Sequence, residues 1–381
     1  MFLFLFGPLM AAMGAFVCWR LVFPLPLTTL WKTVWYALIM AGALKMALFR
    51  LFRGTFSINS LPDWLLLASA WWNVAVTALF LLLLAFWAAQ GLAIRFGTCL
   101  SIDPKSAIVF VAAAMLISAY GLWQGTASPR LRHLDLPLAG LPPELEGLRI
   151  VHITDMHIGP LFHAPRTEEL VMRINELEPD LVLITGDIVD GSVRELRADA
   201  APLAKLRARH GVWACPGNHE YYSGFAQWME QFAAFGIHML VNAHAVLWIH
   251  SRPLVLAGVS DEAAARYGLE ASDIDKALAG APADAPRIVL AHRPAGSAEH
   301  ARHGVWAQFS GHTHGGQALL IQPLVRAVND SYLYGLYAVN GMTLYVGAGA
   351  GLWGGYPVRF AMPPEFALFR LTKLAPAAHQ P

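Results

Sequence analysis

The stretch RTEELVMRINELEPDLVLITGDIVDG, residues 166–191, decides the fold class of the more charged part of the chain. Its first half has one apolar face at helical spacing, made by Leu170, Val171, Ile174 and Leu177. The uncharged run 181–185 follows as a short buried strand, and Gly186 ends it before Asp187. A helix that leads into a buried strand predicts an α/β sheet.

Short apolar runs of the same kind recur on both sides of this stretch. We predict strands at 148–154, 181–185, 212–215, 255–259, 288–291, 305–309, 343–346 and 366–371. Together they define an α/β domain over residues 147–373. A proline-rich linker is expected over 129–146, and a disordered tail over 374–381.

The residues before position 130 have the composition of a membrane segment. The whole chain is 56% hydrophobic and 14% charged, with a mean hydropathy of +0.46, whereas soluble domains average about 25% charged residues. Only nine of the 53 charged side chains lie in residues 1–129. Residues 130–381 carry 20 basic and 24 acidic side chains. This balance lacks the excess of positive charge that nucleic-acid binding needs, so no nucleic-acid partner is expected.

We therefore expect a transmembrane region over residues 1–128. About four spans are predicted, at 2–20, 33–50, 66–90 and 106–126, because a helix needs roughly 20 mostly apolar residues to cross a bilayer. Four spans place both chain ends on the same side, and lysine and arginine residues divide almost evenly between the two sides. We expect the globular domain on the cytoplasmic side, with membrane lipids as its neighbours.

Polar side chains follow five of the predicted strands. They are Asp155 and His157, Asp187 and Asp190, Asn218 and His219, His292, and finally His312 and His314. Each group lies beside glycine or proline at the carboxyl end of its strand, where the ligands of open α/β sheets gather. We therefore expect these strand ends to converge on one pocket.

The residue types in this pocket predict metal chemistry. Imidazole and oxygen donors without thiolate suit two divalent ions, Mn, Fe or Zn, of which we favour Mn. Two such ions about 3.5–4 Å apart activate a bridging water at neutral pH and clamp phosphoryl oxygens. The predicted ligands are Asp155, His157, Asp187, Asn218, His292, His312 and His314.

The ordered motifs D-x-H, G-D-x-x-D, G-N-H-E, a lone H and G-H-x-H resemble the calcineurin-like metallophosphoesterase superfamily over about residues 147–371. The exact motif sequences TDMHIG, GNHEYY and GHTHGGQ are further similar to the membrane-associated bacterial branch of this superfamily, in which the domain follows transmembrane helices. The resemblance implies a four-layer α/β/β/α sandwich and a multi-pass protein of the bacterial inner membrane.

The resemblance also implies a role for each residue. One ion would be held by Asp155, His157, Asp187 and His314, and the other by Asp187, Asn218, His292 and His312, so that Asp187 bridges them. His219 would protonate the leaving alkoxide, and Asp190 would orient its ring, because a general acid needs a fixed tautomer.

One residue departs from the pattern of this branch, in which Asn usually follows the lone histidine. Here the position is Arg293, whose guanidinium either reaches a substrate phosphate or pairs with a surface carboxylate. Arg359, in the glycine-rich stretch 347–360, is a second candidate phosphate contact.

Two functions follow from these observations. The first is a membrane-anchored phosphohydrolase that cleaves a phosphodiester or pyrophosphate bond by attack of a metal-bridging hydroxide. Its substrate would be amphiphilic, a phospholipid or a lipid-linked nucleotide such as UDP-2,3-diacylglucosamine. The alternative is a membrane sensor or scaffold whose domain binds a nucleotide or partner without turnover; the intact general acid His219 counts against it.

Overall fold

The computed structural model describes residues 2–45, 47–48, 61–360 and 362–374. The chain divides into two units. The first comprises the residues up to Gln124 together with 355–358, and the second comprises 125–354 and the residues from Arg359 onward.

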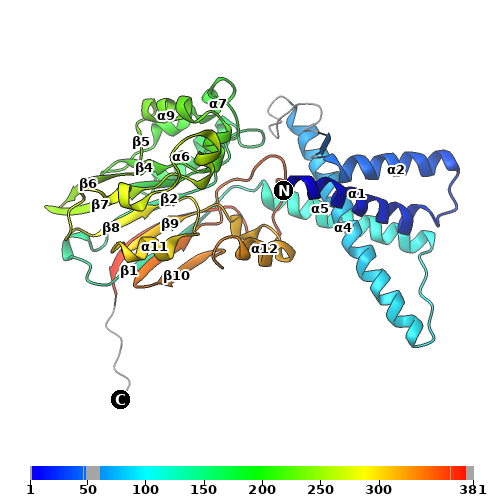
Figure 1. Ribbon diagram of the computed structural model, residues 1–381. Helices are drawn as coiled ribbons and strands as arrows, with labels where there is room; N and C mark the ends of the chain where they lie inside the picture. Colours follow the sequence, from blue (N-terminus) through cyan, green and yellow to red (C-terminus); the bar gives the residue numbers. More distant parts are fainter. Residues whose placement is uncertain (1, 46, 49–60, 361, 375–381) are drawn as a thin grey trace, which may run out of the picture. The chain divides into compact units, whose positions relative to one another are not determined.

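The first unit is built of apolar helices (Figure 1). They are α1 (Phe2–Val17), continued by a π-helical turn at Cys18–Val22, α2 (Thr29–Ala43), α4 (Asp63–Arg95) and α5 (Pro104–Gly125). Within the described residues, α4 and α5 are long and apolar enough to cross a membrane, with 33 and 22 residues. Helix α1 with its π-helical turn runs from Phe2 to Val22, and α2 ends at Ala43, close to residues that the structure does not describe. The expected four spans are not confirmed and remain a prediction. Residues 46, 49 and 50 of the expected span 33–50 lie outside the described residues.

Polar side chains join these helices where their surfaces meet. The amide of Asn73 on α4 donates to the carbonyl of Gly42 on α2 at 2.6 Å. The hydroxyl of Ser118 on α5 donates to the carbonyl of Trp71 on α4 at 2.5 Å. Such bonds fix helix pairs in an apolar environment, where few other partners are present.

The second unit contains two six-stranded sheets, which confirms the predicted α/β class. The first has the spatial order β1 (Arg130–Leu138), β12 (Glu365–Lys373), β2 (Arg149–Ile153), β3 (Leu181–Thr185), β4 (Val212–Cys215) and β5 (Ile237–Met239). The second has the order β10 (Gly335–Val339), β11 (Met342–Val346), β9 (Ala307–Ser310), β8 (Arg287–Leu290), β7 (Arg252–Gly258) and β6 (Ala243–Ile249). Strands β2 to β5 are mutually parallel, as are β7, β8, β9 and β11.

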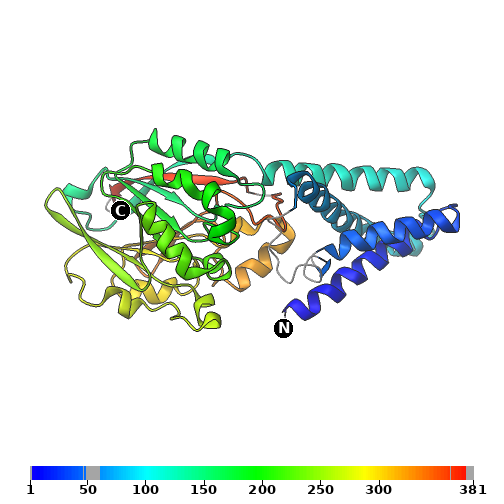
Figure 2. The ribbon, with the colours of Figure 1, turned by 90° about the horizontal axis from the view of Figure 1, so that it is seen from above.

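Three apolar layers hold the sheets and helices together. Both sheets contribute to the middle layer, through residues such as Ile150, Leu183, Leu256 and Phe309. One outer layer packs β2, β3 and β4 against α6 (Ala164–Asn175), α7 (Val193–Ala200) and α9 (Phe225–Ala234). The other packs β7, β8 and β11 against α10 (Ile274–Leu278) and the region of α11 (Ser297–Arg302). The result is the α/β/β/α arrangement, visible from two sides in Figures 1 and 2.

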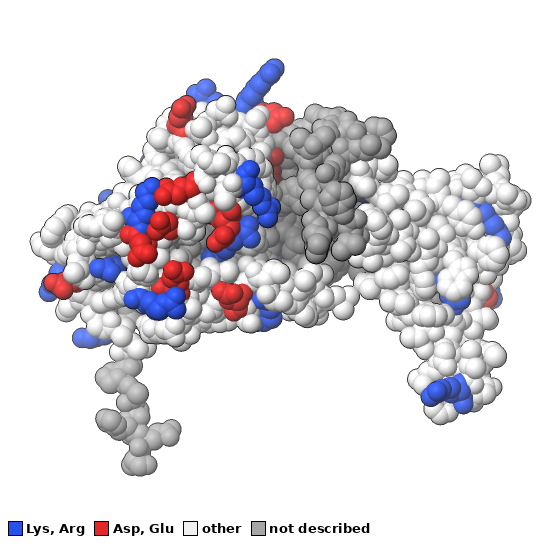
Figure 3. Space-filling model, viewed as in Figure 1, with Lys and Arg blue, Asp and Glu red and all other residues white. Residues whose placement is uncertain are grey.

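The opening stretch folds as its pattern predicts. On α6 the apolar residues Leu170, Val171 and Ile174 are buried, and all five residues of β3 are buried. A strand buried on both faces belongs at the centre of a parallel sheet. On the face of this unit shown in Figure 3, exposed acidic and basic side chains are interspersed.

The residues expected as a linker differ from the prediction. Within 129–146 the structure has strand β1, which pairs in parallel with β12 over nine residues. The polar alternation of RLRHLDLPL hides this strand in the sequence, because β1 lies at the edge of its sheet and only Leu136 and Leu138 are buried. Of the expected tail 374–381, all but Leu374 lies outside the described residues.

Candidate metal centre

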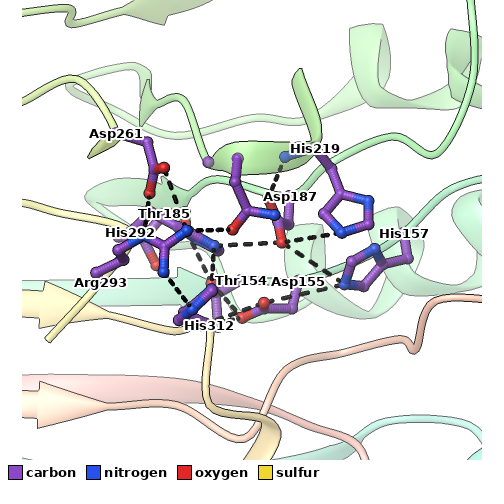
Figure 4. Close-up of polar contacts among 12 residues, drawn as sticks. Thr154, Asp155, His157, Thr185, Asp187, His219, Asp261, His292, Arg293 and His312 are labelled. Carbon is purple, nitrogen blue, oxygen red and sulfur yellow. Dashed lines mark hydrogen bonds and ion pairs between the residues drawn. The ribbon is translucent and has the colours of Figure 1, made fainter. Parts of the chain in front are cut away.

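The strand ends of both sheets meet at one site. Asp155 and His157 follow β2, Asp187 follows β3, and His219 follows β4, all in the first sheet. The second sheet contributes His292 after β8, and His312 and His314 after β9. Figure 4 shows side chains from these loops directed toward one another.

The backbone at this site is held in an uncommon conformation. Five of the seven predicted ligands have positive φ: Asp155 (50°), His157 (49°), Asp187 (51°), His312 (69°) and His314 (50°). Non-glycine residues seldom adopt this region, and each instance costs on the order of 1–3 kcal/mol. The surrounding fold therefore fixes these side chains against their local preference, as is common at functional sites.

Glycines allow the loops to approach one another. A Cβ on Gly186 would overlap the backbone of Gly217, and a Cβ on Gly217 would overlap the carboxylate of Asp187. A Cβ on Gly311 would overlap Thr154 and Asp155. The glycines of the G-D, G-N-H and G-H-x-H motifs are thus required by close packing between loops.

The first group of donor atoms comes from Asp155, His157 and His314, all within 4.8 Å of one another. The two Nε2 atoms of His157 and His314 are 3.2 Å apart. Nε2 of His314 lies 3.5 Å from Oδ1 of Asp155, and Nε2 of His157 lies 3.9 Å from Oδ2 of Asp187.

The second group comes from Asp187, His292 and His312, again within 4.8 Å. Nε2 of His292 is 3.2 Å from Oδ2 of Asp187 and 3.2 Å from Nδ1 of His312. The same oxygen of Asp187 therefore faces both groups, as a bridging ligand must. Asn218 joins this side, since its Oδ1 and Nε2 of His312 both contact Arg293.

The hydrogen bonds of two rings test whether these residues fit a metal. Nδ1 of His157 lies 2.8 Å from the carboxylate of Asp190, and Nδ1 of His292 lies 2.8 Å from the carbonyl of Thr185. Each partner accepts the Nδ1 proton, so in the neutral ring Nε2 presents a lone pair to the cluster. Lone pairs that face carboxylate oxygens repel unless a cation lies between them. The donor set fits divalent ions, because oxygen and imidazole ligands are present and Asp190 and the carbonyl of Thr185 hold the rings in place.

His219 lies beside this cluster. Its Nδ1 is 2.6 Å from Oδ1 of Asp190, and its Nε2 is 3.9 Å from Oδ2 of Asp187. Burial opposes the charged ring, but Asp187 and Asp190 outweigh it and raise the pKa of His219 to about 9. Burial likewise opposes the charged form of Asp190, yet His157 and His219 hold the pKa of this carboxyl below its usual range.

Glu220 supports the site from behind. Its buried carboxylate accepts from the backbone N–H groups of Gly217 (2.7 Å), Asp187 (2.9 Å), Ile188 (2.7 Å) and Val189 (3.3 Å). Burial and the charge of Asp187 raise the pKa of Glu220 to about 7. This residue ties the loop after β3 to the loop after β4, which fixes the positions of Asp187 and His219.

The two predicted substrate arginines lie in different environments. Arg359 is fully buried and donates to the carbonyls of His314 (3.4 Å), Gly349 (3.2 Å) and Gly351 (2.8 Å). Burial lowers its pKa to about 10. With no exposed surface it supports the loop that carries His314, and the phosphate contact expected from the sequence does not fit. Arg293 remains partly exposed at the cluster, and it pairs with a buried carboxylate rather than the surface one considered above.

That carboxylate is Asp261, which the sequence reasoning missed. Its Oδ2 accepts from Nε of Arg293 at 2.8 Å, and its side chain is fully buried. A signal was present, because Asp261 follows the predicted strand 255–259 just as the metal ligands follow theirs. Its motif, VSDE, has none of the glycines that mark the other loops.

Comparisons with known proteins place this geometry in a family. The family model of the calcineurin-like phosphoesterases matches residues 148–316. A transmembrane protein with metallophosphoesterase domain from Danio rerio is 34% identical over 331 residues, 81% of this chain and 74% of the relative. A protein of the same description from Bos taurus is 33% identical over 278 residues, 70% of this chain and 62% of the relative. An uncharacterized metallophosphoesterase of Helicobacter pylori strain J99 is 36% identical, covering 66% of each. The chain belongs to the calcineurin-like metallophosphoesterase family and is a phosphoester hydrolase of that family, which binds two divalent metal ions.

Proposed function

We propose that this protein is a membrane-anchored phosphohydrolase that cleaves a phosphodiester or pyrophosphate bond. The observation that carries the proposal is the convergence of two donor groups on one carboxylate oxygen, Oδ2 of Asp187. This oxygen belongs to the group with His292 and His312 and also faces His157 of the group with Asp155 and His314. We assign these residues, with Asn218, as the ligands of two ions, and we favour Mn. A scaffold without turnover would have no use for His219 placed beside the bridging carboxylate.

Two divalent ions held by this donor set would polarise phosphoryl oxygens and lower the pKa of a bound water. The chain itself supplies the proton for the leaving oxygen. His219 holds its Nδ1 proton against Asp190, so that Nε2 is the atom free to protonate the leaving group. The carboxylate of Asp190 against Nδ1 raises the pKa of His219, which favours the protonated ring that a general acid requires.

An amphiphilic substrate is supported by an apolar surface next to the metal loops. The segment η6 (Leu319–Ile321) and α12 (Gln322–Ala327) exposes Leu319, Leu320, Leu324 and Val328, which are 54–72% accessible to solvent. It packs directly on the loop of His314, since Gln322 donates to the carbonyl of Gly315 at 3.3 Å. Exposed aliphatic patches of this kind mark interaction sites. We propose that this surface, the η6–α12 patch, receives the acyl part of a phospholipid or lipid-linked nucleotide.

The membrane setting agrees with such a substrate. The helical unit has two helices that are long and apolar enough for a bilayer, and the Danio rerio and Bos taurus relatives are named as transmembrane proteins. We propose a multi-pass protein of the bacterial inner membrane with its catalytic unit on the cytoplasmic side. A catalytic unit tethered to a bilayer meets membrane lipids at high local concentration.

The test is hydrolysis of bis(p-nitrophenyl) phosphate by the detergent-purified protein after chelation and Mn²⁺ add-back. We expect metal-dependent turnover that Asp187→Ala abolishes. Asp284→Ala, which removes an exposed carboxylate of the same unit, is the matched control and keeps full activity. Phospholipids and UDP-2,3-diacylglucosamine are then screened. Two bound metals without turnover of any phosphoester or diphosphate would overturn the proposal in favour of a binding domain.

A further inference from the structure

Arg293 is anchored at the rim of the metal centre by a residue buried beneath it. Its Nε and Nη2 donate to the two oxygens of Asp261, at 2.8 and 3.4 Å. The Asp261 side chain is 0% exposed, whereas that of Arg293 is 29% exposed. Asp261 is itself fixed by the backbone N–H of Ala263 at 2.8 Å. Paired donors on one carboxylate set the plane of a guanidinium, so this one is held in a defined orientation.

The other edge of this guanidinium faces the cluster. Nη1 lies 2.7 Å from Nε2 of His312, and Nη2 donates to Oδ1 of Asn218 at 3.2 Å. In Figure 4 Arg293 lies on the side of His292 and His312, while His157 and His219 lie on the other side. The guanidinium therefore lies on the side of the cluster away from the proposed general acid His219.

Metal binding would remove the acceptor of Nη1, which is Nε2 of His312. Nδ1 of His312 faces His292 at 3.2 Å, which makes Nδ1 the nitrogen that the cluster uses. When Nδ1 serves as a ligand, the neutral ring carries its proton on Nε2. Nε2 then cannot accept from Arg293. Nη1 needs another acceptor in the metal-loaded protein, while Nε and Nη2 keep theirs on Asp261.

We infer that Arg293, positioned by Asp261, is a recognition residue for substrates that carry more negative charge at the phosphate than a simple diester. The acceptor that replaces His312 is a phosphate oxygen. A phosphomonoester offers an additional anionic oxygen on the reacting phosphorus, and a diphosphate offers one on the neighbouring phosphorus. Arginine binds such oxygens through charge-assisted hydrogen bonds with fixed geometry. This inference rests on the proposed phosphohydrolase function. It favours diphosphates over simple diesters among the proposed substrates and adds phosphomonoesters to them.

A pair of substrates with the same leaving group tests it. p-Nitrophenyl phosphate is a dianion at pH 8, and bis(p-nitrophenyl) phosphate is a monoanion. We expect Arg293→Asn to lower the ratio of kcat/KM for the monoester to that for the diester by about 10- to 100-fold, the size of one charge-assisted hydrogen bond. Asp261→Asn, which loosens the anchor, should lower the same ratio by a smaller factor. Arg302→Asn removes an exposed arginine at the end of α11 and leaves the ratio unchanged.

UDP-glucose separates the two sources of charge, because its additional charge lies on the second phosphate. A loss confined to UDP-glucose in Arg293→Asn assigns Arg293 to that second phosphate, and a loss confined to the monoester assigns it to the reacting one. An unchanged substrate ratio, with both substrates hydrolysed, overturns the inference.

A binding measurement makes the inference independent of turnover. Calorimetric titration of the Mn²⁺-loaded protein with inorganic phosphate should give an affinity at least tenfold weaker for Arg293→Asn, with two ions still bound per chain. If the wild-type protein hydrolyses none of the substrates, the proposed function fails, and phosphate affinity still decides the role of Arg293. Equal affinity of the two proteins overturns that role.

Discussion

His157 and His219 share one carboxylate oxygen. Oδ1 of Asp190 lies 2.8 Å from Nδ1 of His157 and 2.6 Å from Nδ1 of His219, and the two rings stand nearly perpendicular at a centroid distance of 4.6 Å. A single buried carboxylate thus orients a proposed metal ligand and the proposed general acid at once. The sequence analysis assigned Asp190 to His219 alone.

Asp190→Asn should therefore impair both functions. We expect kcat to fall about 10- to 100-fold and the affinity for metal to fall as well, because the amide cannot accept two N–H bonds with the strength of a carboxylate. Steady-state kinetics and metal content after dialysis measure the two effects. Asp199→Asn is the control, since Asp199 also contacts a histidine, His163 at 3.4 Å, in a more exposed place. Normal metal content and normal kcat would show that Asp190 only fills space.

Removal of the general acid should depend on the leaving group. We expect His219→Ala to lower kcat by about 10²–10⁴-fold for an alkyl phosphodiester, whose alkoxide needs a proton as it departs. The loss should be much smaller for bis(p-nitrophenyl) phosphate, because nitrophenolate leaves without protonation. Equal losses on both substrates would point to a role of His219 in binding or folding.

Arg359 should behave as a structural residue and not as a substrate contact. Arg359→Met leaves several buried carbonyls without a donor, for which we expect a loss of at least about 3 kcal/mol in the free energy of unfolding. Because Arg359 supports the loop of His314, metal affinity should fall too. Thermal unfolding with and without Mn²⁺ measures both. A normal Tm with a raised KM would instead identify Arg359 as a phosphate contact.

His152 should make the protein less stable in mild acid. Its ring is buried between Phe309 and Tyr345, with Nε2 2.8 Å from the hydroxyl of Thr185, and burial lowers its pKa to about 3. The unfolded chain binds a proton near pH 6.5 and the folded chain does not, so stability is full above pH 6.5 and falls as pH drops from 6.5 toward 3.

The expected contribution is about 1.4 kcal/mol between pH 7.5 and pH 5.5. Urea unfolding of wild type and His152→Gln at the two pH values isolates it, since glutamine fills the site and does not titrate. The difference between the two proteins should change by that amount. The same pH dependence in both would exclude His152 as its origin.

The η6–α12 patch should matter only for lipid substrates. Leu320→Gln combined with Leu324→Gln removes exposed apolar surface without touching the core, so the fold should be retained. We expect weaker hydrolysis of a phospholipid in mixed micelles, mainly through KM, and unchanged hydrolysis of bis(p-nitrophenyl) phosphate. The control is Trp248→Gln, which removes an exposed aromatic residue from β6. Equal rates on lipid for wild type and the double variant would remove the support that the patch gives to an amphiphilic substrate.

The sequence correctly predicted the buried strands of both sheets. The runs 181–184 and 288–290 stand out because a strand covered on both faces is continuously apolar. Strands β1, β5, β6 and β10 escaped prediction, because these four edge strands are only partly buried and most carry polar side chains.

By itself the sequence determined which side chains come together at the candidate metal centre. These residues can be recognised in the sequence because local constraints mark them. A glycine lies at most close approaches, a short strand precedes each loop, and metal-ligand side chains follow in a fixed order. Only the tertiary structure decided how these residues act together. That Asp190 serves two histidines, that Arg359 is buried and that Asp261 anchors Arg293 depend on contacts between residues 29 to 45 positions apart in the chain. Such pairings follow from the packing of one loop against another, for which sequence spacing carries no signal.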